Sequence, residues 1–281
     1  MLTINSASEM NALTKEARRA GKRVGLVPTM GALHQGHLSL VRAARSQSGM
    51  VVVSIFVNPT QFGPAEDFAK YPRSLGNDSA LLAVEKADYV FAPSVEEMYP
   101  PGANTWVIVE GLSNMLDGRS RPGHFRGVTT VVAKLFNIVQ PDAAFFGQKD
   151  AAQAAIIRQM VRDLNFDVDI VVCPIVREPD GVAMSSRNAY LSPTERKQAT
   201  VLYRALMRVQ MLADRGETDC AKLVAAAKQV IGEEPAVRLD YFEIVDPDTL
   251  EPLPGTSGGA LVAVAAHVGS TRLIDNLMLY R

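Results

Sequence analysis

The sequence contains few cysteines and no long apolar run. Cys173 and Cys220 are the only two cysteines in 281 residues, and they lie in segments of different character. Two distant cysteines make no disulfide framework, so we expect both thiols to be reduced, as cytoplasmic thiols are. No stretch reaches the ~18 apolar residues that a membrane span needs. The first residues, MLTINSASEM, lack the basic and then apolar layout of a secretory signal, so we expect a cytoplasmic protein.

An excess of charge of either sign is also missing. The 29 Lys and Arg residues nearly balance the 30 Asp and Glu residues, which leaves a formal net charge of −1. This balance gives no reason to expect binding to nucleic acid or to a membrane surface. The chain also lacks the G-x-x-x-x-G-K-[ST] pattern of a P-loop and the G-x-G-x-x-G pattern of a dinucleotide-binding turn. Its 47% apolar and 21% charged residues are ordinary for an enzyme of one large or two modest domains.

The stretch that organises the rest of the chain runs over residues 24–41 and reads VGLVPTMGALHQGHLSLV. Its apolar start predicts a buried strand of a parallel sheet, which Pro28 is expected to end. A glycine-bearing turn follows, and the apolar spacing from His37 onward predicts a helix. His34 and His37 stand on either side of Gly36 at the start of that helix. Because a helix N-terminus offers unpaired N–H groups and a partial positive charge, we predict a phosphate site here.

Two other interpretations of the histidine pair are open. A His-x-x-His pair often only packs or faces solvent, although the strand, glycines and helix around this pair favour a ligand site. Zinc is the weaker alternative, because the H-E-x-x-H pattern needs a glutamate where this chain has Gln35 and Gly36.

Apolar runs that alternate with helical periods predict an α/β fold with a doubly wound parallel sheet. Strands of this sheet are expected at residues 24–27, 50–56, 89–91, 143–146 and 168–172, with a further extended run at 106–109. Helices are expected at residues 6–20, about 75–86, about 128–139 and 151–163.

Polar residues follow several of these strands. Asn58 and Gln61 come after the second strand, and Gln148 and Lys149 come after the strand at 143–146. Ligands of open α/β sheets bind outside the carboxyl ends of the strands, so these side chains are candidates to contact one. Lys149 is placed to reach a phosphate as a point charge.

A basic loop precedes the helix expected at about 128. It carries Arg119, Arg121, His124 and Arg126. Two interpretations have equal weight: an anion pocket, since cations gather ahead of a helix start, or a solvated basic loop.

The last third of the chain changes character. A polar cluster at 185–188 follows a Pro-Asp-Gly turn, and the Ser-Pro-Thr-Glu sequence at 192–195 predicts a helix start. Helices are expected to about 213 and at 219–231, and strands at 238–246, 260–266 and 271–279. Because helices followed by antiparallel strands differ from the pattern before them, we expect two domains, 1–176 and 177–281.

The chain resembles the pantothenate synthetase family over essentially its whole length. The matching segments are PTMGALHQGHLSLV, SIFVNPTQF, YPRSL, RPGHFRGVTTVVAKLFNIVQPD, FFGQKD and AMSSRNAYLSP. An H-x-G-H motif with a later loop of the K/M-S-x-S type occurs in a wider nucleotidyltransferase superfamily, whereas the combination with VNPTQF and GQKD is much narrower. The resemblance implies a Rossmann-like N-terminal domain that binds ATP and pantoate, and a smaller α+β C-terminal lid domain.

The resemblance also implies a reaction. Members of the family use ATP to join (R)-pantoate to β-alanine in pantothenate and coenzyme A biosynthesis. The pantoate carboxylate attacks the α-phosphorus, which gives pantoyl adenylate and pyrophosphate, and the amine of β-alanine then displaces AMP. In such a reaction the protein mainly positions the reactants and stabilises charge.

The resemblance further implies the site residues. The catalytic residues are expected to be His34, His37, Lys149, Ser185 and Arg187. ATP is expected to contact Met30, Gly31, Ala32, Leu33, His34, Gln35, Gly36, His37, Gly147, Gln148, Lys149, Asp150, Val176, Met184, Ser185, Ser186 and Arg187. The substrate-binding residues, for pantoate and β-alanine, are expected to be Gln61 and Gln153.

A metal ion and a partner subunit are implied in the same way. The Mg²⁺ of the family is held mainly by ATP phosphates with help from an acidic residue, which here is Asp78. The preceding position, often acidic in the family, is Asn77. Members of the family are expected to be homodimers.

Two other functions are open at this point. A simple nucleotidyltransferase of the wider superfamily would have no second step and no requirement for β-alanine, and the VNPTQF loop argues against it. A nucleotide-binding module without catalysis would release no pyrophosphate in the presence of pantoate. The retention of His34, His37 and Lys149 argues against that second alternative.

Overall fold

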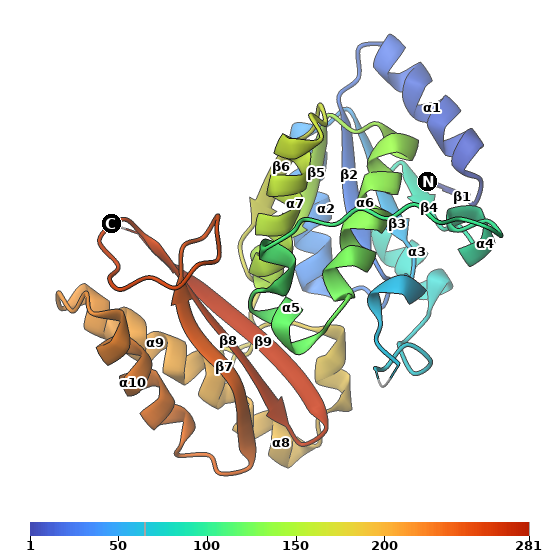
Figure 1. Ribbon diagram of the computed structural model, residues 1–281. Helices are drawn as coiled ribbons and strands as arrows, with labels where there is room; N and C mark the ends of the chain where they lie inside the picture. Colours follow the sequence, from blue (N-terminus) through green and yellow to red (C-terminus); the bar gives the residue numbers. More distant parts are fainter. Residues whose placement is uncertain (65, 281) are drawn as a thin grey trace.

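The computed structural model describes residues 1–64 and 66–280. They form two units, each built on its own sheet (Figure 1). The N-terminal unit holds a six-stranded parallel sheet and the C-terminal unit a three-stranded antiparallel sheet. No described helix is long and apolar enough to cross a membrane.

The large sheet has the strand order β1-β4-β3-β2-β5-β6. Its strands are β1 (Leu2–Ile4), β2 (Val24–Thr29), β3 (Met50–Ile55), β4 (Tyr89–Phe91), β5 (Ala143–Gly147) and β6 (Asp169–Cys173). The helices of this unit are α1 (Ala7–Arg19), α2 (Gln35–Gln47), α3 (Leu75–Val84), α4 (Val95–Met98), α5 (Asp117–Ser120), α6 (His124–Val139) and α7 (Ala151–Asp163).

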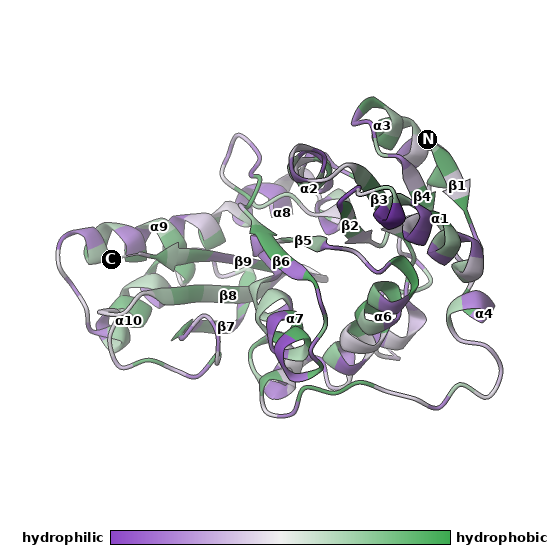
Figure 2. Ribbon diagram, turned by 90° about the horizontal axis from the view of Figure 1, so that it is seen from above, coloured by the Kyte–Doolittle hydropathy of each residue, from purple (hydrophilic) through white to green (hydrophobic). Residues whose placement is uncertain are grey.

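Helices cover both faces of this sheet, which explains why its central strands are mostly apolar. Helices α1, α6 and α7 pack on one face and α2 and α3 on the other (Figure 2). Successive residues of a strand therefore enter different cores: Leu26 and Phe146 pack with α6 and α7, while Val27 and Phe145 pack with α2.

The strands β2 and β5 are neighbours, but the helices that follow them lie on opposite faces of the sheet. Only Gly25 and Leu26 of β2 pair with β5, whereas β2 pairs with β3 as far as Thr29. The two strands thus separate at their carboxyl ends, which is the arrangement that opens a ligand crevice in α/β sheets. The sequence predicted that Pro28 ends this strand. That prediction is wrong, because pairing with β3 continues through Pro28 to Thr29.

The C-terminal unit has the strand order β7-β8-β9. Its elements are α8 (Pro193–Gln198), α9 (Thr200–Asp214), α10 (Cys220–Ile231), β7 (Val237–Val245), β8 (Ala260–Val268) and β9 (Thr271–Leu279). Helices α9 and α10 cover one face of the sheet, and the other face contributes Tyr241 and Leu261 to the core of the N-terminal unit.

The predicted fold class is confirmed, with three further differences in detail. The edge strand β1 was not predicted, because three residues are too few to show a period. The extended run at 106–109 joins no strand ladder; instead Val107 bonds through its backbone to the Thr129 and Thr130 hydroxyls on α6. The helix expected from 193 to 213 is interrupted at Ala199.

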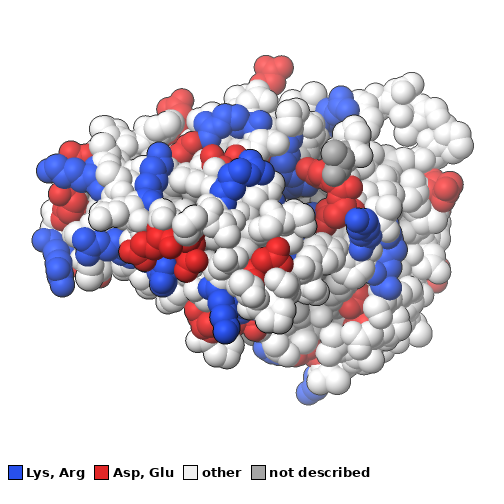
Figure 3. Space-filling model, turned by 90° about the horizontal axis from the view of Figure 1, so that it is seen from below, with Lys and Arg blue, Asp and Glu red and all other residues white. Residues whose placement is uncertain are grey.

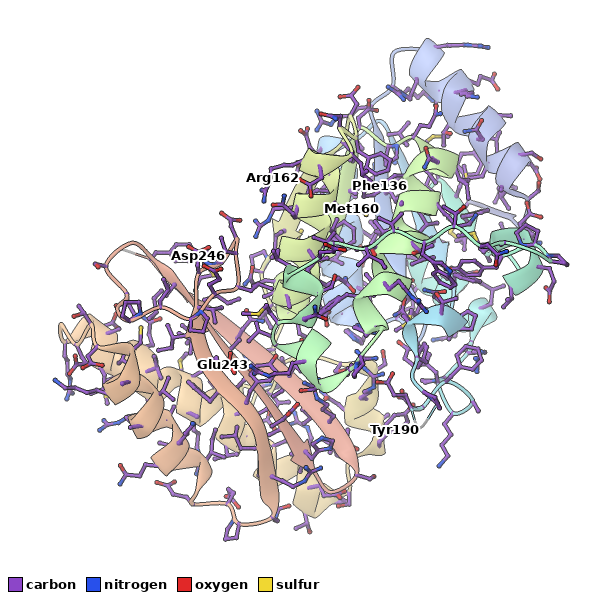
Figure 4. The ribbon with its side chains drawn as sticks, in the orientation of Figure 1. Phe136, Met160, Arg162, Tyr190, Glu243 and Asp246 are labelled. Carbon is purple, nitrogen blue, oxygen red and sulfur yellow. The ribbon has the colours of Figure 1, made fainter. Side chains whose placement is uncertain are left out.

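Charged side chains connect α5 of the N-terminal unit to β7 and β9 of the C-terminal unit. Glu243 on β7 faces α5 and pairs with Arg119 (Figure 4). Arg272 on β9 lies 2.7 Å from the Asp117 carboxylate on α5 and 2.8 Å from that of Asp240 on β7. These pairs hold α5 against the small sheet.

Candidate active site

A cavity of about 1110 Å³ lies between the two sheets. We call it the inter-sheet cavity. Its lining includes Lys149, Asp150 and Gln153 from the region after β5, and Ser185 and Arg187 from the connection between the units. The turn after β5 thus faces the second unit across this space, whereas the loop after β2 is not part of the lining.

The loop after β2 ends in a helix cap built from two histidines. His34 is the N-cap of α2, and its Nδ1 accepts a hydrogen bond from the Gly36 backbone N–H at 3.1 Å. The Nδ1 of His37 accepts from the His34 backbone N–H at 3.3 Å. Because both Nδ1 atoms accept, the proton of each neutral ring is on Nε2. A Cβ at position 36 would come within 2.9 Å of the His34 ring, so this close approach requires glycine.

Both imidazoles are neutral. Burial, assisted by the charge of Lys149, lowers the pKa of His34 to about 4. Burial, assisted by His34, lowers the pKa of His37 to about 3. The ring centroids are 4.1 Å apart, and no described residue accepts a hydrogen bond from either Nε2. The start of α2 therefore presents two adjacent N–H donors that carry no charge of their own.

These pKa values predict acid sensitivity of the fold. Burial and Arg121 lower the pKa of His124 to about 4 as well, so three histidines are neutral when folded. In the unfolded chain they take up protons near pH 6.5. The unfolded state thus binds more protons below pH 6.5, and the free energy of unfolding is expected to fall as pH decreases from about 6.5 to 4.

The measurement is denaturant unfolding at a series of pH values, with imidazole resonances followed by NMR. An unfolding free energy that is constant between pH 6.5 and 5, with imidazoles that titrate near pH 6.5 in the folded enzyme, would contradict the prediction. Glu66 acts at lower pH: burial raises its pKa, but Arg121 outweighs burial and holds it at about 2. The stability that the ionised Glu66 contributes to the fold is lost as the pH falls from the usual glutamate pKa to about 2.

The segment between β2 and the histidines is held by Asp78. Gly31 and Ala32 both have positive φ, 82° and 50°. The Asp78 carboxylate accepts from the backbone N–H of Ala32 at 2.9 Å and of Leu33 at 2.8 Å. Asp78 is 1% exposed. Both of its oxygens therefore serve the loop that carries the histidines.

The turn after β5 places Lys149 at the cavity. Its Nζ lies 3.5 Å from Oδ1 of Asp150, and Gln153 lines the same cavity from the first turn of α7. Gly147, at the end of β5, and Gln148 lead into this turn.

The connection between the units brings the polar residues 185–187 to the loop after β2. Met184 lies beside Gly36, and its backbone N–H donates to the Val176 carbonyl at 3.0 Å. The Ser186 hydroxyl is 3.5 Å from the Ala32 carbonyl. The Arg187 guanidinium forms a two-point pair with Asp67 at 2.9 and 3.0 Å.

Gln61 is buried next to the loop after β2. Its Oε1 accepts from the Asn58 side chain at 3.1 Å, so its Nε2 is left as a donor and lies 3.2 Å from the Met30 sulfur. The Asn58 amide also donates to the carbonyl of Gly127 on α6 at 3.1 Å. A Cβ at Gly127 would lie 2.6 Å from the Gln61 Cα, so α6 fixes this turn at contact distance.

The basic loop before α6 consists of cations that already have partners. Arg121 pairs with both oxygens of Glu66 at 2.7 Å. Nδ1 of His124 lies 2.8 Å from the Gln61 carbonyl. The Arg126 guanidinium lies over the Trp106 ring, 4.4 Å from its centroid. Of the two interpretations, a free anion pocket is the less compatible with these contacts.

The expected site residues thus converge from four segments: 30–37, 58–61, 147–153 and 184–187. Sequence reasoning missed Glu66 and Asp67, whose loop shows no motif, and Asn276, which is described below. The face seen in Figure 3 carries basic and acidic side chains intermixed, with no patch of one sign. Among the described residues, no three His, Cys, Asp or Glu side chains cluster as a metal site.

Comparisons with known proteins agree with this geometry. A family model described as pantoate-beta-alanine ligase matches residues 2–278. Proteins named pantothenate synthetase from Koribacter versatilis and Thermotoga neapolitana are 65% and 57% identical over 99% of this chain, and the matches cover 96% and 100% of those proteins.

Solved structures are similar as well. The crystal structure of pantothenate synthetase from Thermus thermophilus is 50% identical, with a TM-score of 0.94 and 99% of each chain covered. The pantoate-beta-alanine ligase of Francisella tularensis, crystallised in complex with beta-gamma ATP and beta-alanine, is 33% identical. Its TM-score is 0.81, and the match covers 99% of this chain and 97% of that chain.

Proposed function

The chain belongs to the pantoate–β-alanine ligase family, and we propose how its inter-sheet cavity carries out the reaction of that family. The enzyme joins pantoate to β-alanine with ATP, giving pantothenate, AMP and pyrophosphate through pantoyl adenylate. The ATP and β-alanine of the Francisella tularensis complex support both ligands for this chain.

The observation that carries the proposed site is the histidine cap of α2. Two neutral rings present adjacent Nε2–H donors at a helix N-terminus, which suits the oxygens of a phosphate chain. Lys149 is close enough to lower the pKa of both histidines, and with Ser185 and Arg187 it lines the inter-sheet cavity and supplies further donors and positive charge. These five side chains are proposed to bind the β- and γ-phosphates and to stabilise pyrophosphate as it leaves. The neighbouring loop residues contact the rest of ATP.

Pantoate is proposed to bind beside Gln61 and Gln153. The Asn58 amide fixes the orientation of Gln61, so that Gln61 donates through Nε2. Such a donor suits a carboxylate or hydroxyl oxygen of the substrate. Gln153, one helical turn after Lys149, would then hold the carboxylate near the α-phosphorus.

Mg²⁺ is proposed to arrive bound to the ATP phosphates. The carboxylates near the site fit this arrangement, because Asp67 pairs with Arg187, Asp150 lies beside Lys149 and Asp78 binds backbone N–H groups. Mg²⁺ keeps several waters and often takes few protein ligands, so it supplies charge neutralisation without a dedicated cage. Asp78 then acts on the loop and not directly on the metal.

We further propose that the chain divides near residue 176, with residues 1–176 binding ATP and pantoate and residues 177–281 forming a lid. The core that the C-terminal sheet forms with α9 and α10 supports this division. The reaction is proposed to occur in the cytoplasm, in keeping with two cysteines that are both free.

An isotope experiment tests which phosphorus is attacked. If the pantoate carboxylate carries oxygen-18, attack on the α-phosphorus should transfer one labelled oxygen to AMP and none to free phosphate. The physical reason is that donors gathered around the β,γ-unit favour its departure as pyrophosphate. Mass spectrometry of AMP and phosphate gives the result, and ADP with labelled phosphate would refute the mechanism even if pantothenate were formed.

The enzyme is proposed to be a homodimer that pairs through residues 103–109. Trp106 and Ile108 are 40% and 55% exposed, and no hydrogen bond among the described residues uses their backbone groups. An extended segment whose outward-facing backbone groups are unpaired and whose apolar side chains are exposed is a template for pairing with another chain. A second copy of the segment fits it, because antiparallel pairing about Val107 satisfies both copies at once.

Sedimentation velocity tests this surface. Ile108→Asp places a charge in the pairing surface and should shift the enzyme to monomer. Val84→Asp is the matched control, since Val84 is 79% exposed on α3 and lies elsewhere. A parental assembly state for Ile108→Asp, or equal dissociation in both variants, would rule out this interface.

A further inference from the structure

Two neighbouring residues on β9 contact both of the segments that carry phosphate donors. Asn276 donates through Nδ2 to the carbonyls of Gln148 and Lys149, each at 2.9 Å. Its Oδ1 accepts from the Gln148 side chain at 3.0 Å. Asn276 is 3% exposed. Its amide therefore uses both donors and its acceptor on the turn after β5.

Asp275 contacts the other segment. Its carboxylate pairs with Arg177 through two bonds of 2.6 and 2.9 Å, and it is 4% exposed. Arg177 also donates to the Gly181 carbonyl at 2.9 Å and lies over the Tyr203 ring, 4.6 Å from its centroid. It begins the turn that pairs with Ala183 and leads directly into Met184–Arg187.

The strand supplies the geometry that makes this double contact possible. Successive side chains of a strand point to opposite faces, so adjacent residues reach two different segments. The whole of β9 is paired with β8, from Thr271 to Leu279, so the backbone that carries both side chains is held along its length. The carbonyl atoms that Asn276 binds belong to Lys149 itself and to the residue before it, so a shift of β9 moves the lysine.

We propose that Asp275 and Asn276 are positioning residues that set the spacing between Lys149 and the Ser185–Arg187 cluster. The C-terminal sheet then does more than cover the substrates, because it also fixes the position of Lys149 on the N-terminal unit. This inference rests on the proposed role of Lys149 in binding ATP phosphates. Apolar packing alone would keep the units together but would not fix the two backbone carbonyls of the turn.

The test uses Asn276→Asp, which keeps the size of the side chain but removes both N–H donors. Leu277→Ala is the matched control, because Leu277 is the next residue on β9 and packs in the C-terminal core. Asn276→Asp is expected to raise KM for ATP and to lower kcat of pantoate-dependent ATP–pyrophosphate exchange by about 10- to 100-fold, as small misplacements of a binding group do. KM for pantoate should not change. Leu277→Ala should lower Tm and leave the exchange of the folded enzyme unchanged.

Several outcomes would overturn the inference: parental kinetics in Asn276→Asp, an equal loss in Leu277→Ala, or an equal rise of KM for pantoate. Asn276→Ala removes the donors without adding charge and provides the same comparison if the aspartate variant does not fold.

A double-mutant cycle separates this inference from the proposed site. If Asn276 acts through Lys149, Asn276→Asp should add little to the loss in a Lys149→Ala enzyme. If Lys149→Ala is impaired and Asn276→Asp is not, the positioning role alone is refuted. If Lys149→Ala itself keeps parental exchange and KM for ATP, the proposed role of Lys149 fails.

Discussion

Replacing Lys149 with alanine is expected to lower pantoate-dependent ATP–pyrophosphate exchange by about 100- to 1,000-fold, the usual cost of removing one preorganised donor from a charge-stabilising site. Negative charge moves to the pyrophosphate as the adenylate forms. Since His34 and His37 are neutral in the free enzyme, Lys149 is a main source of fixed positive charge on this side of the cavity. Arg187 is held by Asp67 through two hydrogen bonds, whereas the contact of Lys149 with Asp150 is longer, at 3.5 Å. Losing Lys149 therefore removes charge that the other donors do not replace.

The exchange assay is combined with circular dichroism and thermal unfolding of the same preparation. Lys197→Ala on α8 is the control, because Lys197 is exposed and lies outside the cavity lining. A folded Lys149→Ala enzyme with near-parental exchange, or a Lys197→Ala enzyme that loses as much, would contradict the expectation.

Local patterns in the sequence predicted where several of the proposed site residues lie in the fold. Strand, glycine turn and helix follow one another within residues 24–41, so the placement of His34 and His37 at the start of α2 depends only on neighbouring residues. The same holds for Lys149 after β5 and for the capping box at Ser192. Fold class followed from the repetition of such units, because strands that alternate with helices favour a parallel sheet.

Contacts between distant parts of the chain could not be predicted in this way. Asn276 and Lys149 are separated by 127 residues, and no local pattern links them. His124 and Arg121 look like anion binders in sequence, yet Glu66 and the Gln61 carbonyl occupy them in the fold. The role of a charged residue depends on which partner the fold brings to it, and loops such as the one containing Glu66 carry no periodic signal.

The histidine cap also bears on how His37 acts. A ring whose Nδ1 accepts a backbone N–H and whose pKa is about 3 holds a single proton, on Nε2, at neutral pH. That form donates a hydrogen bond to a phosphate oxygen without first being protonated. In the proposed site His37 would therefore stabilise charge as a neutral donor, and proton transfer from it would require bound phosphate to raise its pKa considerably.

Replacing Asp78 with asparagine is expected to lower exchange by about 100-fold, because misplacing a binding loop by about 1 Å has effects of this size. Asparagine has one acceptor oxygen where aspartate has two, so its NH₂ group would face the N–H of Ala32 or Leu33. Ala32 has a φ of 50°, a left-handed conformation that an alanine adopts only when its surroundings hold it. Releasing this loop moves the histidines that follow it.

A control variant and the Mg²⁺ dependence of the rate show whether Asp78 anchors the loop or binds the metal directly. Asp142→Asn is the matched control, since Asp142 accepts the Val24 backbone N–H at 2.7 Å at the opposite end of β2. Asp78→Asn should lose about 1–3 kcal/mol of unfolding free energy, the cost of a buried unsatisfied group, and should lose exchange. Asp142→Asn keeps an oxygen that can accept the Val24 N–H on a part-exposed side chain, so it should keep its exchange and most of its stability. If Asp78 anchors the loop, the Mg²⁺ concentration for half-maximal rate stays parental while the maximal rate falls. Recovery of the Asp78→Asn rate at raised Mg²⁺ would instead identify Asp78 as a metal ligand.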